Sequence, residues 1–294
     1  MKALLEPIKE IARFDELFRD LKKGTAGVTV ISGCLESQKA HMIAGLSEDA
    51  PVRLLIAENE LKAKELYEDY RLYDAETLYY PAKDLIFYQA DIHGNLLIRQ
   101  RLQVIQALLE RKEVTIITSV GGCMDFLLPL GVFEKHCIHL RNDSEFDLDK
   151  IRKELVRLGY ESTFQVESTG QFSVRGGILY IYPLTEQNPI RIELWGDEID
   201  SIRSFDAESQ RSIENLEEIT IYPASELILT EDTIARGVKA IKKEAKAQST
   251  KFRDKMMTEE AARIRHAAEE ICDQIGEGEI LQGAEQYLHY FYPE

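Results

Sequence analysis

Short apolar runs alternate with longer stretches of helical periodicity through the first 145 residues. Between the runs, apolar residues recur at three- and four-residue spacing in segments 39–46, 61–73 and 95–111, which predicts helices. Strands that are apolar on both faces and alternate with helices are typical of a parallel sheet covered on both sides. The apolar runs that we interpret as its strands are 28–32, Val52–Ala57, Thr77–Tyr80, Val114–Ser119 and 137–140.

The pattern changes after residue 140. Asp147 or Asp149 can cap a short helix over 151–158, which Gly159 closes. Gly196 and Asp197 read as a tight hairpin turn between two alternating runs. Alternating strands follow one another with short connections, which predicts a small antiparallel α+β domain. Its predicted strands are Gln171–Arg175, 178–182, Ile190–Trp195, Glu198–Phe205 and 219–222, and helices are predicted after it over 232–248, 251–275 and 280–290.

Composition places the chain among globular proteins, with 294 residues, 44% hydrophobic and 30% charged. No apolar run reaches the roughly 20 residues that a membrane span needs, and the N-terminus reads as an amphipathic helix rather than a secretion signal. The four cysteines are scattered and form no CxxC pair, which favours a reducing cytoplasm. The chain ends directly after the apolar residues of YFYPE, so we expect it to be a fragment of a longer protein.

The net charge of −16 argues against a nucleic-acid-binding body, because phosphate binding needs clustered cations. One segment, 236–255, departs from this balance with eight basic residues against Glu244 and Asp254. We interpret it as the solvated face of a long helix. DNA binding through this segment is the alternative.

Residues 33–40 read GCLESQKA and have the spacing of a nucleotide-binding P-loop. Such a loop needs a glycine before its lysine, the lysine itself, and a hydroxyl that binds Mg²⁺. Gly33 opens the motif and Lys39 stands at the correct distance, but Gln38 replaces the second glycine and Ala40 replaces the hydroxyl. We therefore predict an inactive nucleotide loop with no catalytic residue and no cofactor. An ordinary loop with a stray lysine would lead to the same prediction.

Two further motifs carry no chemistry in our interpretation. The DEID sequence at 197–200 spells a helicase box, but it follows a turn glycine and a half-polar strand instead of a buried one. The HCIH sequence at 136–139 would point alternate side chains to opposite faces of a strand. Zinc binding there is not expected, and we predict no metal site.

Strand alternation selects candidate interface residues in the second domain. In Ile190–Trp195 the isoleucines and Leu194 share one face, so Arg191, Glu193 and Trp195 point outward. In Gln171–Arg175 the same rule places Ser173 and Arg175 outward. Tryptophan and arginine are the residue types that most often anchor protein interfaces.

Four segments together resemble the N-terminal module of the bacterial transcription-repair coupling factors: ISGCLESQKA, LLIAENELKAKELY, QFSVRGGILYIYP and RIELWGDEIDSIRSFDAESQRS. That module is itself similar to the excision-repair helicase UvrB. The resemblance covers nearly the whole chain and implies an α/β fold with a degenerate RecA- or helicase-like parallel sheet. The implied domains are the first part of the helicase-like domain (1–145), an inserted UvrB-like α+β domain that docks onto UvrA (146–225), and a helical return to the first domain (226–294).

The family's docking residues correspond to Arg175 of VRG, Arg191 of IRIELW, and Trp195, where relatives carry phenylalanine. Alternation selects the same three outward positions. The chain departs from UvrB at Ser173, where UvrB has another docking arginine, and at 81–94, which lacks UvrB's long tyrosine-rich DNA hairpin.

The resemblance implies a docking protein without its own ATPase, which mimics UvrB and brings UvrA to stalled RNA polymerase. DNA and RNA polymerase would be reached only through the rest of the protein, with no membrane partner. Downstream domains of the full-length protein would contact this module. The alternative is an ATP-dependent, UvrB-like repair helicase in which Lys39 binds phosphate.

Overall fold

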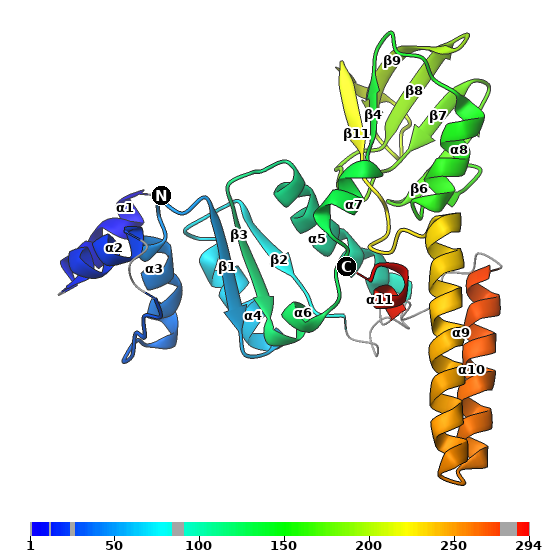
Figure 1. Ribbon diagram of the computed structural model, residues 1–294. Helices are drawn as coiled ribbons and strands as arrows, with labels where there is room; N and C mark the ends of the chain where they lie inside the picture. Colours follow the sequence, from blue (N-terminus) through cyan, green and yellow to red (C-terminus); the bar gives the residue numbers. More distant parts are fainter. Residues whose placement is uncertain (1, 12, 24–26, 84–90, 277–286, 294) are drawn as a thin grey trace. The chain divides into compact units, whose positions relative to one another are not determined.

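A computed structural model describes residues 2–11, 13–23, 27–83, 91–276 and 287–293 of the chain (Figure 1). It divides into two compact units, Met1–Asp125 and Phe126–Glu294. Each unit is mixed in structure, with parallel strands in the first and mainly antiparallel strands in the second. The predicted α/β fold class is confirmed.

The first unit contains a parallel sheet whose strand order is β1-β3-β2. The strands are β1 (Val52–Ala57), β2 (Thr77–Tyr80) and β3 (Val114–Ser119), all with the predicted bounds. β3 is buried along its whole length because it lies between the other two. The helical elements are α1 (Lys2–Leu5), η1 (Glu6–Glu10), α2 (Phe14–Lys22), α3 (Glu36–Leu46), α4 (Glu60–Tyr70), α5 (Asp91–Leu109) and α6 (Val120–Met124).

Helices pack on both faces of this sheet. On one face Ala40 and Ala44 of α3 and Tyr70 of α4 meet Leu55 and Ile117. The other face is covered by α5, through a cluster of Val104, Ala107, Val114, Ile116 and Tyr80. The cover is incomplete at the edge strand β1, where Val52, Leu54 and Ile56 are about half exposed.

Two predicted strands of the first sheet are wrong. Residues 28–32 have no strand structure, and Val28 and Val30 are 93% and 85% exposed. β-branched residues favour an extended backbone, but a strand also needs a neighbour that pairs with it. The predicted strand 137–140 exists as β4 (Ile138–Arg141), yet it pairs antiparallel with β11 (Glu218–Ile221) in the second unit.

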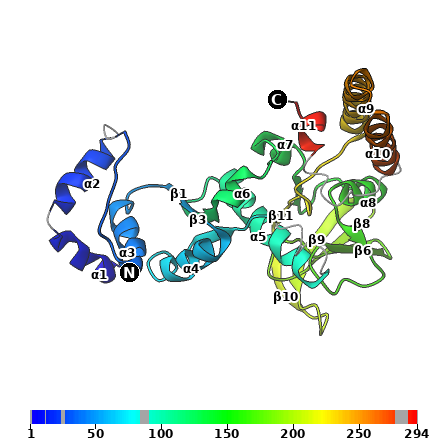
Figure 2. The same ribbon diagram turned by 90° about the horizontal axis from the view of Figure 1, so that it is seen from below.

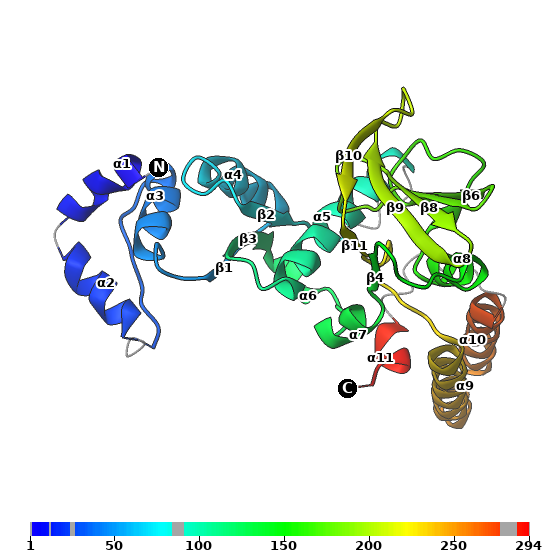
Figure 3. The same cartoon turned by 90° about the horizontal axis from the view of Figure 1, so that it is seen from above.

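The second unit contains a six-stranded sheet in the order β10-β9-β8-β7-β6-β5. All its pairings are antiparallel except that of β5 with β6. Figure 3 shows β8, β9 and β10 side by side, with α8 (Leu148–Arg157) nearby. The strands are β5 (Glu161–Ser162), β6 (Gln171–Arg175), β7 (Ile178–Ile181), β8 (Ile190–Trp195), β9 (Glu198–Phe205) and β10 (Ser212–Leu216).

The predicted alternation holds across this sheet. Four neighbouring strands each contribute an inward side chain that is at most 1% exposed: Phe172, Leu179, Ile192 and Ile202. Gly196 turns β8 into β9 with a φ of +65°, a conformation that glycine adopts without steric cost. β10 was not predicted, because its sequence SIENL is polar and mostly exposed.

Helices complete the second unit. α7 (Leu130–Lys135) precedes β4, and α9 (Glu231–Asp254) and α10 (Thr258–Gly276) form a hairpin, side by side in Figures 1 and 2. The predicted break at 248–251 is wrong, since α9 continues through it. Ser249 is buried there and its Oγ donates to the Ala261 carbonyl, which joins the two helices. Most of the predicted helix 280–290 lies outside the described residues, and α11 (Leu288–Phe291) contains its end.

The domain boundaries at 145 and 225 stay predictions. Along the sequence, the boundary between the observed units falls between Asp125 and Phe126. β4 belongs to the second unit because it pairs with β11 there. Residues 226–294 cluster with that unit, and their return to the first domain also stays a prediction.

The sequence left Asp147 and Asp149 as alternative caps of α8, and the structure assigns the role to Asp147. Its Oδ1 accepts a hydrogen bond of 3.0 Å from the Lys150 amide. We expect Asp147→Ala to lower the free energy of unfolding by about 1 kcal/mol, because it leaves a helix amide without its acceptor. Asp147→Asn should retain most of this stability. Asp149→Ala should cost only a few tenths of a kcal/mol from the helix dipole. Urea denaturation of the three variants checks the assignment, which equal effects of both alanine variants would contradict.

Candidate docking site

The outward face of the six-stranded sheet carries arginines on aromatic rings. Ser173, Tyr180, Arg191 and Arg203 stand opposite one another on β6 to β9. Each has a buried apolar residue next to it in sequence, so this row belongs to the opposite, outward face; these inward residues are Phe172, Leu179, Ile192 and Ile202. We call the following residues the arginine–aromatic face: Phe164, Arg175, Tyr180, Arg191, Glu193, Trp195, Arg203 and Phe205. The Phe205 ring is only 1% exposed and lies against Arg191 and Tyr180.

Arg175 lies between two aromatic rings. Its guanidinium carbon is 5.4 Å from the ring centre of Phe164 and 4.8 Å from that of Tyr180. Phe164 itself is 83% exposed. A guanidinium held against rings keeps a fixed orientation, so Arg175 presents its charge in a defined position.

Arg191 is held by a different set of contacts. It lies 5.8 Å from the ring centre of Phe205, and its Nη2 donates a 2.6 Å hydrogen bond to the Ser212 hydroxyl. The carboxylate of Glu193 lies between Arg191 and Arg203, with its Oε1 3.4 Å from Arg191 Nε and 4.0 Å from Arg203 Nη1. The three arginines are accompanied by two glutamates, Glu193 and Glu198, of which Glu198 is the cross-strand partner of Trp195.

The Nε atoms of Arg175, Arg191 and Arg203 are buried and donate no hydrogen bond within the described part of the chain. For Arg191 the 3.4 Å contact with Glu193 is an ion pair without hydrogen-bond geometry. Arginine can meet a planar carboxylate through two parallel hydrogen bonds. Rings hold Arg175 and Arg191 in place, and because all three Nε atoms are covered, a partner carboxylate would meet these arginines through their Nη atoms.

Trp195 ends β8 and is 83% exposed. It pairs across the hairpin with Glu198, and the turn at Gly196 lies directly beyond it. Arg191 lies four residues earlier on the same strand, about 13 Å away. A large aromatic side chain left in solvent beside fixed arginines has the composition of a binding hot spot.

The prediction that Ser173 points into solvent is wrong. The residue is only 1% exposed, and its Oγ donates a 2.9 Å hydrogen bond to the Phe164 carbonyl. The segment that carries Phe164 covers it, which alternation within a strand cannot reveal. Arg175 and Arg191 are also half-buried rather than fully exposed, because they lie against aromatic rings.

Phe164 and Arg203 were not among the sequence-predicted site residues. Arg203 could have been found, since alternation along β9 places it outward beside Arg191. Phe164 precedes β6 in an irregular segment, where no periodicity assigns a direction.

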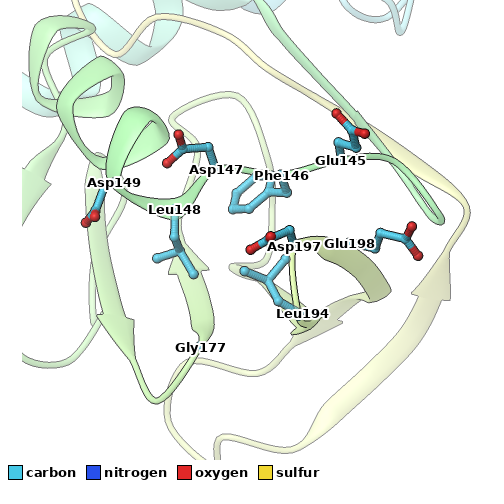
Figure 4. A pocket seen from close by; sticks show the side chains of 10 residues that line it. Glu145, Phe146, Asp147, Leu148, Asp149, Gly177, Leu194, Asp197 and Glu198 are labelled. Atoms are coloured by element: carbon cyan, nitrogen blue, oxygen red, sulfur yellow. The ribbon is translucent and has the colours of Figure 1, made fainter.

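An acidic cavity of about 870 Å³ lies next to the hairpin that carries Trp195. Figure 4 shows its carboxylates spread around the rim. Backbone hydrogen bonds from Phe146 to the Asp197 carbonyl and from Ile199 to the Ser144 carbonyl join its walls. Among the described residues no group of histidine, cysteine or acidic side chains is arranged to hold a metal ion. The cavity is lined by Glu145, Phe146, Asp147, Leu148, Asp149, Gly177, Leu194, Gly196, Asp197 and Glu198.

Side chains of the nucleotide-like loop contact other residues of the same loop. Gln38 accepts a hydrogen bond at Oε1 from the Leu35 amide, and Lys39 forms an ion pair of 2.7 Å with Glu36. Ala40 is 2% exposed and packs in the core beside the sheet. A side chain at this position faces the core, where a Mg²⁺ ligand would have no access to solvent.

The HCIH motif also makes local contacts. His139 Nδ1 lies 3.0 Å from the Thr220 hydroxyl across the strand pair, and His136 Nδ1 lies 3.8 Å from a Glu154 carboxylate oxygen. Burial raises the pKa of the Cys137 thiol to about 11, so its sulfur stays protonated at neutral pH.

Polar groups at the carboxyl ends of the parallel strands are bonded to one another. Glu60 accepts hydrogen bonds from the Tyr79 hydroxyl, the Ala82 amide and the Ser119 hydroxyl. Burial and the nearby Glu60 carboxylate raise the pKa of Tyr79, so its hydroxyl remains a donor. This edge, where open α/β sheets bind ligands, is held together by its own side chains.

Residues 138–227 match the family model of the UvrB interaction domain. The match spans β4 to β11 and so includes the whole six-stranded sheet and the arginine–aromatic face. The second unit thus carries a UvrB interaction domain, a protein-binding module.

The chain as a whole is a homologue of the transcription-repair coupling factors, as the sequence resemblance implied. It is 34% identical to the Transcription-repair-coupling factor of Bacillus subtilis (strain 168), over 95% of this chain and 25% of the relative. It is 38% and 37% identical to the proteins of that name from Staphylococcus aureus strains USA300 and MRSA252, each over 80% of this chain and 20% of the relative. The chain therefore spans a quarter or less of these relatives. None of the helices in the described ranges is both long and apolar enough to cross a membrane.

Proposed function

We propose that this chain is the docking module through which a transcription-repair coupling factor binds UvrA. The arginine–aromatic face of the UvrB interaction domain is the observation that carries the proposal. It combines an 83% exposed tryptophan with two arginines, Arg175 and Arg191, that aromatic rings hold in place. Arg175, Arg191 and Trp195 are the proposed anchors.

The chemistry of this face indicates what it would meet on UvrA. Arg175, Arg191 and Arg203 are suited to carboxylates, because a guanidinium fork matches a carboxylate bidentately. Trp195 and Phe164 offer apolar area that binding would remove from water. Glu193 holds two of the arginines in position and limits the net charge. We therefore expect UvrA to present acidic side chains around an apolar pocket.

The module would act by mimicry of UvrB, whose interaction domain it resembles. If both proteins use the same UvrA surface, only one can occupy it, so UvrA would pass from the coupling factor to UvrB. The remainder of the full-length protein would supply the contacts with RNA polymerase and the main contacts with DNA, and other domains of it would mask this face. The four unpaired cysteines fit the reducing cytoplasm as the place of action.

Competition tests the proposed function. UvrA is bound to labelled UvrB, and the chain is added at increasing concentration. We expect it to displace UvrB, while a triple variant with Arg175→Ala, Arg191→Ala and Trp195→Ala should not. If UvrA instead binds UvrB and the chain at the same time, without displacement, the two do not share a surface and the mimicry proposal is contradicted.

We also propose that the first unit is a scaffold without ATPase activity. Ala40 lies in the core, Lys39 is paired with Glu36, and Gln38 binds the Leu35 amide within the loop. These contacts favour the inactive loop over the helicase alternative, in which Lys39 would bind phosphate.

ATP is accordingly expected to bind the chain negligibly, with or without Mg²⁺. The loop lacks the glycine and the hydroxyl that hold phosphate and metal. Calorimetric titration with ATP measures this directly, with Lys39→Ala as the comparison. Micromolar binding to the unaltered chain that Lys39→Ala abolishes would favour the helicase alternative instead.

A further inference from the structure

The helical hairpin of α9 and α10 contains a basic groove in an otherwise acidic protein. Lys242, Lys246 and Arg253 of α9 and Arg265 of α10 line a groove of about 430 Å³. All four side chains are exposed. Of the lining residues that the structure describes, Glu269 alone is acidic. The groove thus concentrates four positive charges against one negative charge in a chain of net charge −16.

The helix aligns these cations along one stripe. Residues four and seven positions apart return to similar sides of a helix. From Lys242 to Arg253 the stripe runs about 16 Å along the helix axis, and Arg265 adds a charge from the facing helix. The other basic residues of this region, among them Lys239, Lys243 and Lys251, do not line the groove.

The four cations of the groove have no ion-pair partner among the described residues. Their charged groups form no ion pair and no hydrogen bond with any residue that the structure describes, unlike Arg53, Arg101 and Arg191 elsewhere in the chain. Keeping like charges together costs free energy that an external anion would recover. The groove therefore has the electrostatics of an anion-binding surface.

The lining also distinguishes between kinds of polyanion. Among the described residues that line the groove, Ala245 and Ala268 are the apolar ones and none is aromatic. A protein partner is usually anchored by large apolar or aromatic groups, as on the arginine–aromatic face. Binding of a phosphate backbone requires only cationic side chains on the protein. A duplex carries about one negative charge per 1.7 Å of its axis.

We propose that this groove is a contact site for the phosphate backbone of duplex DNA. It is independent of the UvrA-docking face and uses different helices. Four cations on an acidic chain give weak, salt-sensitive binding, so the contact acts together with stronger ones. It would bind DNA without regard to sequence, since phosphates carry no sequence information.

Two matched variants test the site in the whole chain. The groove variant combines Lys242→Gln, Lys246→Gln, Arg253→Gln and Arg265→Gln. The control variant combines Lys239→Gln, Lys243→Gln, Lys251→Gln and Arg263→Gln, all exposed residues of the same two helices outside the groove. Both lose the same net charge. Equal melting temperatures verify that neither is unfolded, and single variants such as Arg265→Gln replace any set that melts early.

Fluorescence anisotropy with a labelled duplex provides the measurement, from low to physiological salt. We expect binding at low salt that the groove variant weakens at least tenfold and the control variant at most about threefold. The slope of log affinity against log salt should become shallower by about 3.6 in the groove variant, because each of the four phosphate contacts contributes roughly 0.9.

Three outcomes would overturn the proposal. The unaltered chain could fail to bind DNA even at low salt, or both variants could weaken binding equally, which is an effect of net charge alone. The third is that a polyglutamate peptide binds as tightly as DNA and that only the groove variant loses this peptide binding. That result would indicate an acidic protein partner.

Discussion

Replacing Trp195 with alanine is expected to weaken UvrA binding by about 2–4 kcal/mol, because it removes the aromatic anchor of the docking face. The same change should alter the free energy of unfolding by no more than about 1 kcal/mol, since surface truncations rarely cost more. The side chain is 83% exposed before binding and contributes little to the core. Calorimetry with UvrA and thermal melting of the same variant check both statements.

Val156→Ala is a suitable control for this variant. Val156 lies on α8 of the same domain and is 55% exposed, so its truncation also removes exposed apolar surface. It should leave UvrA binding unchanged. Intact binding by Trp195→Ala would remove Trp195 from the docking face, and a large fall in its melting temperature would show that the side chain supports the core instead.

Arg175→Ala and Arg191→Ala are each expected to cost about 2–4 kcal/mol of UvrA binding where the guanidinium meets a desolvated carboxylate, and less at the rim. Both side chains also pack on aromatic rings, so each variant should lose about 1 kcal/mol of folding stability through that contact. Binding and melting are measured on the same preparations.

Arg175→Lys and Arg191→Lys separate geometry from charge. Lysine keeps the charge but lacks the planar fork, so most of the affinity should still be lost. Arg152→Ala, on an exposed site of α8, is the control and should bind UvrA normally. Full binding by the lysine variants would mean that charge alone is recognised and that the stacked geometry is unimportant.

The docking domain was largely predictable because its strands alternate strictly. The bounds of β6, β8 and β9 agree with the sequence-based ones, and the inward positions Phe172, Ile192 and Ile202 are fully buried. A period of two with one buried face fixes the direction of every side chain in such strands. The outward placement of Trp195 followed from the same rule.

Features that depend on contacts between distant segments were not predictable. Ser173 is outward within its strand but covered by the segment of Phe164. Segment 28–32 has strand-forming residues and no paired neighbour, and β4 pairs with β11, about 80 residues away, as the register Ile138↔Ile221 shows. Local periodicity contains no information on which segments meet.

The single tryptophan makes a direct measurement of the docking face available. The chain has one tryptophan, Trp195. When it is replaced biosynthetically by 5-hydroxytryptophan, its fluorescence can be excited separately from any tryptophan of UvrA. Quenching by acrylamide then reports the exposure of this side chain alone.

In the free chain we expect strong quenching, since the Trp195 side chain is 83% exposed. Addition of UvrA should protect the fluorophore, so that the quenching constant falls severalfold as the complex forms. Gel filtration of the same mixture establishes that the complex is present. A complex in which quenching stays as strong as in the free chain would show that UvrA binds elsewhere, and would contradict the arginine–aromatic face as its docking surface.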